Sequence, residues 1–208
     1  MSAASAIPII LLAAGQSARM RGADKLAEEI EGEPLLRVMA RRARAATDGP
    51  VLVALPPAPH PRYAMLDGLD VTPVPVDRAD EGMNASLSTA MAILPEDAPA
   101  VMILLADLPD LQENHIRITL QAVAKYPDNL IWRGTTAGGN PGHPVVFARA
   151  LFPELRTLTG DSGAQSVVKA HKDRVALIPL PGDAALNDLD TPEDWARWRA
   201  AQTQKTER

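Results

Sequence analysis

Residues 7–26, IPIILLAAGQSARMRGADKL, join an apolar run to a loop of small and basic side chains. The run Ile7–Ala13 is short and almost continuously apolar, which is typical of a strand buried on both faces of a parallel sheet. Ala13, Ala14 and Gly15 follow at once, so the chain leaves this strand through small residues. The stretch therefore favours an α/β fold in which helices cover both faces of the sheet.

The rest of the chain alternates short apolar runs with segments that carry apolar residues at helical spacing. The expected strands are Val51–Leu55, Val101–Leu105, Leu130–Trp132 and Val175–Leu180, with a weaker one at Val71–Val76. The expected helices are Pro34–Ala46, Ala85–Leu94, Glu113–Lys125 and Ser162–Ala170. Pro73 and Pro75 lack an N–H donor, which confines their strand to a sheet edge. The alternation predicts a single-domain, three-layer α/β sandwich with a mostly parallel sheet.

Two segments near the C-terminus have other patterns. Residues 133–147, RGTTAGGNPGHPVVF, are rich in Gly, Thr and Pro, which predicts an irregular excursion or a hairpin. The stretch TPEDWARWRA predicts a final helix with Thr191 as its cap and Pro192 at its first position. From Gln202 the chain is polar, so we expect a domain of residues 1–201 and a frayed tail, 202–208.

Composition excludes several classes of protein. The chain of 208 residues has a net charge of −5, which argues against general binding to nucleic acid or to acidic membranes. It has no cysteine, so disulfides, thiolate metal sites and a cysteine nucleophile are excluded. No apolar run approaches the roughly 18 residues that span a bilayer. The start lacks a basic segment and is interpreted as a buried strand rather than a signal peptide, which predicts a cytoplasmic protein.

The loop after the first strand has the composition of an anion site. In α/β sheets, ligands bind beyond the carboxyl ends of the strands, where small residues let backbone N–H groups approach a phosphate. Arg19, Arg21 and Lys25 could neutralise a triphosphate there. The spacing of Gly15 and Gly22 differs from that of a Walker A loop, and the G-x-G-x-x-G fingerprint is absent. The alternative is an ordinary connection that carries surface basic residues.

Carboxylates follow the expected strands at two places. Asp107 comes directly after the run Val101–Leu105 and should stand at the carboxyl edge of the sheet, as a magnesium ligand or as an ordinary turn residue. Asp188 and Asp190 are two residues apart, so in an extended segment they face the same side. Either could provide a second carboxylate for magnesium.

Six segments together resemble one enzyme family. LAAGQSARMRGADKL is similar to the signature L-A-A-G-x-S-x-R-M-G-x-x-K-L of nucleotidyltransferases with a GT-A-like, Rossmann-like fold, apart from one extra residue before the glycine. Five further segments follow in the family's order. They are GMNASL at 82–87, LLADLPDL at 104–111, GNPGHPVVF at 139–147, GDSGAQ at 160–165 and DLDTPEDW at 188–195. The set resembles the molybdenum cofactor cytidylyltransferase branch.

The resemblance implies a magnesium-dependent transfer of CMP from CTP to molybdopterin, with release of pyrophosphate and delivery of the product to a molybdenum enzyme. The implied nucleotide-binding residues are Leu12, Ala13, Ala14, Gly15, Arg19, Lys25, Gly82 and Ser86. The implied catalytic residues are Arg19, Lys25 and Asp107, the metal ligands are Asp107 and Asp190, and the acceptor contacts are Gly142, His143 and Asp161. From the residues alone, capping of a helix by Asn84 or Ser86 is the favoured interpretation of the segment 82–87, and His143 could be a buried, hydrogen-bonded histidine.

Other functions remain open at this stage. The acceptor could be a sugar phosphate, a methylerythritol phosphate or a purine-pathway cofactor, and the donor could be GTP. A non-catalytic carrier or chaperone for the molybdenum cofactor is an alternative of another class. Ala14 favours CTP, because the guanylyl branch usually has glycine there and a methyl group should disfavour a two-ring base.

Overall fold

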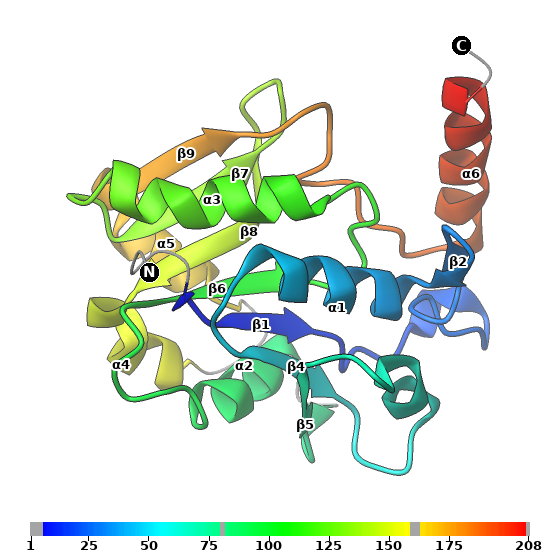
Figure 1. Ribbon diagram of the computed structural model, residues 1–208, viewed down its shortest axis with the longest axis horizontal. Helices are drawn as coiled ribbons and strands as arrows, with labels where there is room; N and C mark the ends of the chain where they lie inside the picture. The colour runs from blue at the N-terminus through cyan, green and yellow to red at the C-terminus, as the bar shows by residue number, and fades with distance from the viewer. Residues whose placement is uncertain (1–5, 80–81, 159–162, 207–208) are drawn as a thin grey trace.

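A computed structural model describes residues 6–79, 82–158 and 163–206 of the chain (Figure 1). Its centre is a seven-stranded sheet in the order β5-β4-β1-β6-β8-β7-β9. The strands of this sheet are β1 (Ile9–Leu12), β4 (Val51–Leu55), β5 (Thr72–Pro75), β6 (Ala100–Leu105), β7 (Ile131–Thr135), β8 (Pro141–Ala148) and β9 (Val175–Pro179). A separate small ribbon pairs β2 (Glu29–Ile30) with β3 (Glu33–Pro34).

Helices cover both faces of the sheet, which confirms the predicted α/β sandwich (Figure 1). The α-helices are α1 (Leu35–Ala46), α2 (Met83–Met91), α3 (Glu113–Lys125), α4 (Phe152–Arg156), α5 (Gln165–Ala170) and α6 (Pro192–Thr206). Ile9 and Leu11 of β1 pack into the hydrophobic cluster that includes α1 and α3. Ile10 packs into the opposite cluster with α2, α4 and α5. Because β1 is buried on both sides, its sequence is continuously apolar.

The sheet is parallel except at β8, which runs antiparallel to both β6 and β7. The segment 133–147 therefore forms a hairpin, one of the two predicted forms, and its second strand enters the sheet between β6 and β7. The strand that contains Pro73 and Pro75 lies at the edge, as the missing N–H donors require. None of the helices in the described ranges is long and apolar enough to cross a membrane.

The C-terminal helix begins as predicted and ends later than predicted. Thr191 Oγ1 accepts a hydrogen bond from the Asp194 N–H at 3.2 Å, and Asp194 Oδ2 accepts one from the Thr191 N–H at 2.9 Å. Helix α6 continues past Gln202, where the polar tail was expected to begin, as far as Thr206. The Gln202 side chain donates to Asp110 at 3.3 Å, a long-range contact that holds this part of the helix to the domain.

The start of α5 also differs from the prediction. The helix begins at Gln165 rather than Ser162, because Gly163 and Ala164 form a turn in which Gly163 has a φ of 56°. A positive φ is incompatible with a helix and is adopted readily by glycine. The remainder of the predicted start lies outside the described residues.

Candidate active site

The candidate site lies where the sheet changes its direction of winding. β1 pairs with β4 on one side and with β6 on the other, so the carboxyl ends of β1 and β6 lie side by side, with Leu12 opposite Leu105. The loop 13–26 leaves one of these ends, and Asp107 follows the other. Ligands of open α/β sheets bind at such a point.

Lys25 joins the two predicted carboxylates at this edge. Its Nζ lies 2.5 Å from Asp107 Oδ2 and 2.6 Å from Asp190 Oδ1, and all three side chains are largely buried. Arg19 contacts the other oxygen of Asp190 at 2.8 Å while its own side chain stays exposed. The structure therefore brings Arg19, Lys25, Asp107 and Asp190 together, although they come from distant parts of the chain.

Backbone hydrogen bonds bring Asp190 to the strand that carries Asp107. The Leu189 N–H donates to the Asp107 carbonyl oxygen at 3.1 Å. One residue later, the Asp190 N–H donates to Asp194 Oδ2 at 3.3 Å, so the first turn of α6 also fixes this segment. Asp188 is exposed, and the structure gives Asp190 the position beside Asp107.

The charges of these groups depend on one another. Burial by itself lowers the pKa of Lys25. The charges and hydrogen bonds of Asp107 and Asp190 raise this pKa by more than burial lowers it, so the amine remains protonated. Although Asp188 is exposed, partial desolvation of its carboxyl raises its pKa, and the negative charges of Asp107 and Asp190 raise it too, against a backbone hydrogen bond and the charge of Lys25 that lower it. The site is therefore a pair of carboxylates whose two negative charges are offset by the buried ammonium of Lys25 and the exposed guanidinium of Arg19.

The carboxylate pair fits a divalent cation. Asp107 Oδ1 is buried and has no hydrogen-bond partner among the described residues. Asp107 and Asp190 already contact one positive centre, the Lys25 ammonium. Among the described residues there is no cluster of three or more metal-ligating side chains. Two carboxylates completed by phosphate oxygens and water are the usual environment of magnesium, so the donor set suits a cation that arrives with a nucleotide.

A cavity of about 390 Å³ opens above this group. Every predicted nucleotide-binding residue except Arg19 lines it, namely Leu12, Ala13, Ala14, Gly15, Lys25, Gly82 and Ser86, and Asp107 lines it as well. Gly82, with a φ of 93°, precedes the first turn of α2, and within the described part of the chain no side chain caps this helix. The alternative interpretation of Ser86 as a helix cap is therefore wrong, because Ser86 lies inside the helix and faces the cavity.

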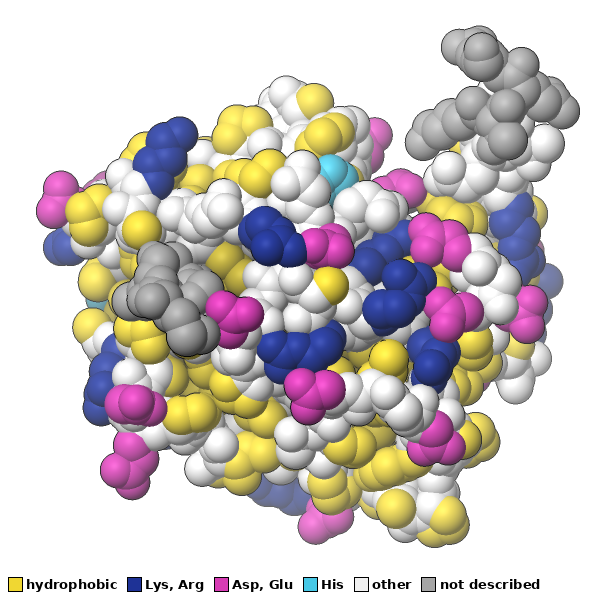
Figure 2. Space-filling view, viewed as in Figure 1, with side chains coloured by type: hydrophobic (Ala, Val, Ile, Leu, Met, Phe, Trp, Pro, Cys, Tyr) yellow, Lys and Arg dark blue, Asp and Glu magenta, His cyan; other side chains and the backbone are white. Residues whose placement is uncertain are grey.

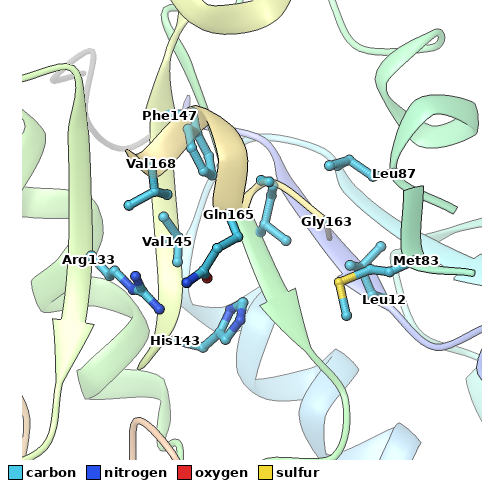
Figure 3. Close-up of a pocket in the computed structure, with 12 residues that line it drawn as sticks. Leu12, Met83, Leu87, Arg133, His143, Val145, Phe147, Gly163, Gln165 and Val168 are labelled. Carbon is cyan, nitrogen blue, oxygen red and sulfur yellow. The ribbon is translucent and has the colours of Figure 1, made fainter. Parts of the chain in front are cut away.

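A second cavity adjoins the first and shares Leu12 and Met83 with it. Its walls are mostly apolar, and the side chains of Arg133, His143 and Gln165 point toward one another at one end (Figure 3). Met83 is 44% exposed and lies at the boundary between the two cavities. The second cavity is close enough to the first for one ligand to extend from one into the other.

His143 is uncharged in this cavity at neutral pH. Burial lowers its pKa to about 4, and the nearby charge of Arg133 acts in the same direction, against smaller opposite effects of the Ile103 backbone and Asp107. Its Nδ1 is buried and has no hydrogen-bond partner among the described residues. A neutral imidazole cannot provide the positive charge that a phosphate needs, whereas the Arg133 guanidinium can.

The other two predicted acceptor contacts have different outcomes. Gly142 is packed against the Ala185 backbone, and a Cβ at this position would lie 2.0 Å from the Ala185 carbonyl oxygen. This close packing explains the glycine without any contact to a ligand. Asp161 lies outside the described residues.

Basic side chains do not form a broad patch on the face seen in Figure 2, where Lys and Arg alternate with Asp and Glu. Arg21, the third basic residue of the loop, is exposed and pairs with Glu193 at 2.5 Å. On this face positive charge is therefore interspersed with negative charge, which agrees with the overall negative charge of the chain.

Two buried arginines were not recognised as important in the sequence. Arg42 is 5% exposed and donates to the carbonyl oxygens of Pro109 and Leu111. Arg62 is 2% exposed and contacts the loop 13–26. Nothing in their local sequence signals burial, since their partners lie far away along the chain.

Comparison with known proteins assigns the family. Residues 9–175 match the profile of the MobA-like NTP transferase domain. The chain belongs to this family. It is a nucleotidyltransferase family, and nucleotidyltransferases of this fold use divalent metals.

Three relatives cover nearly the whole chain. The purine catabolism protein PucB of Bacillus subtilis is 28% identical over 92% of this chain and 95% of its own length. A probable molybdenum cofactor guanylyltransferase of Natronomonas pharaonis is 30% identical over 91% and 95%. The crystal structure of Rv0371C from Mycobacterium tuberculosis in complex with manganese is 26% identical, covers 92% of this chain and 97% of that chain, and superposes with a TM-score of 0.76.

Proposed function

We propose that the protein is a magnesium-dependent cytidylyltransferase that transfers CMP from CTP to the terminal phosphate of molybdopterin. An acceptor phosphate oxygen attacks the α-phosphorus of CTP, the bond from that phosphorus to the bridging oxygen breaks, and pyrophosphate leaves. The observation that carries the proposal is Lys25, held between Asp107 and Asp190 beneath a cavity lined by the loop after β1. Such a transfer needs positioning and charge neutralisation and no protein nucleophile.

Each residue of the group has a defined task in this proposal. Asp107 and Asp190 hold the magnesium ion, which neutralises phosphate charge when bound. Lys25 then donates to the triphosphate, because the carboxylates it bridges in this structure serve as ligands of the cation. Arg19, whose side chain is exposed beside Asp190, adds a second positive charge at the outer end of the triphosphate.

The preference for CTP rests on Ala14. This residue lines the nucleotide cavity, and it packs in a small apolar cluster with Ala54, Val76 and Ala85. Ala14 is 3% exposed, so its methyl group acts through the backbone of the loop, which it restricts, and a restricted loop supports a one-ring base. GTP is the second candidate donor, because the relative from Natronomonas pharaonis is named a probable guanylyltransferase.

The second cavity supports an acceptor larger than a simple phosphate. It continues from the nucleotide cavity through Leu12 and Met83 and ends at Arg133, His143 and Gln165. In the proposal the acceptor phosphate points toward Lys25, and the ring system of molybdopterin lies between the apolar walls. The product would then pass to a molybdenum enzyme.

The test is pyrophosphate release from CTP or GTP with molybdopterin and magnesium, using Asp107→Asn as the inactive control. The methyl group of Ala14 is the difference on which the choice of base depends. A difference of about one methyl group predicts a preference for CTP over GTP of roughly 10- to 200-fold in kcat/KM. Equal values, or a preference for GTP, contradict the cytidylyl assignment. Pyrophosphate release only with a sugar phosphate or methylerythritol phosphate contradicts the assignment of molybdopterin as the acceptor. No release with any of these pairs, while molybdopterin still binds, favours a carrier.

A further inference from the structure

Arg62 is a buried charge that the proposed chemistry does not use. It stands in the short helix η3 (Pro61–Leu66), in the connection between β4 and β5. Its side chain is 2% exposed, and arginine is almost never this buried unless its charge is paired. All of its side-chain hydrogen bonds in the described structure go to the loop 13–26, which carries Arg19 and Lys25.

The guanidinium binds three points of that loop. Nε and Nη2 donate to the two carboxylate oxygens of Asp24 at 2.8 Å and 2.6 Å, a bidentate pair. Nη1 donates to the Ala13 carbonyl oxygen at 2.5 Å, at the exit from β1. Nη2 also donates to Ser17 Oγ at 3.2 Å. A lysine ammonium could not reproduce this planar arrangement.

Ser17 and Asp24 pass this restraint on to the backbone beside the catalytic lysine. Ser17 Oγ donates to Asp24 Oδ1 at 3.1 Å and accepts from the Lys25 N–H at 3.2 Å. Asp24 Oδ1 also accepts from the Leu26 N–H at 3.0 Å. Ser17 has a left-handed backbone, with a φ of 52°, which a side chain adopts only where the surroundings hold it.

The Asp24 carboxyl is charged at neutral pH. Burial by itself raises its pKa, but the hydrogen bonds and charge of Arg62, together with hydrogen bonds from the Leu26 backbone and the Ser17 side chain, bring the pKa below its usual value. Asp24 therefore keeps the negative charge that makes its bidentate bond with the guanidinium strong.

We propose that Arg62 is a positioning residue for the nucleotide site: through Asp24 and Ser17 it holds the loop 13–26 in the shape that presents Lys25 to the triphosphate. Arg62 is 2% exposed, so in this proposal it acts through these two residues. The proposal rests on the proposed role of Lys25 toward the triphosphate. The proposal predicts that weakening the hydrogen bonds from Arg62 to the loop 13–26 impairs nucleotide binding and turnover more than it impairs folding.

The variants are Arg62→Lys, which keeps the charge, and Ser17→Ala, which removes only the linking hydroxyl. Arg37→Met is the matched control, because Arg37 donates to the carbonyl oxygens of Met65 and Asp67, at the far end of the same connection. Five quantities are measured for each variant: the melting temperature, kcat for CTP, KM for CTP, the affinity for inorganic tripolyphosphate, and amide hydrogen exchange at Lys25 and Leu26.

We expect Arg62→Lys to lose about 100-fold in kcat/KM, as for a displaced catalytic group, although its melting temperature falls no further than that of Arg37→Met. Amide exchange at Lys25 should accelerate in Arg62→Lys and Ser17→Ala but not in Arg37→Met. The double variant should lose less than the product of the two single losses, because both act through one network. An Arg62→Lys variant that matches Arg37→Met in kcat/KM and in exchange overturns the proposal.

If Arg62→Lys does not fold, the Ser17→Ala variant provides the test. The proposal is overturned if amide hydrogen exchange and tripolyphosphate affinity in Ser17→Ala equal those of the wild type. The failure of the proposed function gives a different result. In that case the wild type shows no turnover with CTP, while exchange and tripolyphosphate affinity still report on the loop.

Discussion

Replacing Lys25 with methionine removes the ammonium and keeps most of the side-chain volume. In the structure this ammonium makes charge-assisted contacts of 2.5 Å and 2.6 Å with Asp107 and Asp190. Such bonds contribute about 1.5–3 kcal/mol each when desolvated. All three side chains retain some exposure, 14% for Lys25, and solvent screens the remaining repulsion between the carboxylates. We therefore expect Lys25→Met to destabilise the fold by about 1–3 kcal/mol without unfolding it.

The same substitution should affect metal binding and turnover in opposite directions. Without nucleotide, the ammonium occupies the position between the carboxylates and competes with a divalent cation. Its removal should tighten Mn²⁺ binding to the protein by about 10-fold, which corresponds to about 1.4 kcal/mol. Turnover should fall by roughly 100-fold or more, because a cation aimed at developing phosphate charge contributes about 2.7–4 kcal/mol in comparable sites.

The assay combines Mn²⁺ titration by electron paramagnetic resonance with pyrophosphate release at saturating CTP and acceptor. Arg21→Met is the matched control, since Arg21 is a cation of the same loop that pairs with Glu193 instead. It should leave both quantities close to wild type. Weaker Mn²⁺ binding in Lys25→Met, or turnover within a few-fold of wild type, would refute the reasoning.

Three further outcomes follow from the site. Asp107→Asn and Asp190→Asn should each weaken Mn²⁺ binding at least 10-fold. If Asp107→Asn keeps the turnover of the wild type at limiting magnesium, Asp107 is not a metal ligand. Ala14→Gly should narrow the kcat/KM ratio of CTP to GTP toward one; an unchanged ratio would exclude Ala14 as its determinant. His143 has a folded pKa of about 4, below the unfolded value, so the protein should lose stability as pH falls from about 6.5 to 4. His143→Gln should flatten that decline, measured by urea denaturation, and an unchanged slope would contradict the assigned pKa.

The fold could largely be predicted because its strands are buried on both faces. β4 has the predicted bounds, and β6 starts one residue before the predicted strand, because continuous apolar runs leave few alternatives. The loop after β1 and Asp107 after β6 followed from the rule that ligands bind at the carboxyl ends of strands. That Asp190 rather than Asp188 reaches Lys25 depends on the Leu189 hydrogen bond to Asp107, which sequence spacing does not encode.

The supporting residues could not be predicted, since burial of a charged side chain depends on distant partners. Arg62 is 38 positions from Asp24, and Arg42 reaches carbonyl oxygens 67 and 69 positions away. Arg133 enters the second cavity because β8 inserts between β6 and β7, and the sequence left that hairpin undecided. A polar pair such as Ser17 and Asp24 inside a glycine loop is the one local sign that a cation is needed behind it.

The most direct test of the shared cation site is a crystal structure with Mn²⁺ and a non-hydrolysable analogue of CTP. We predict one Mn²⁺ ion bound to both Asp107 and Asp190, with Lys25 Nζ moved from the carboxylates to a phosphate oxygen of the analogue. A cation bound elsewhere, with Lys25 still bridging Asp107 and Asp190, would contradict the account.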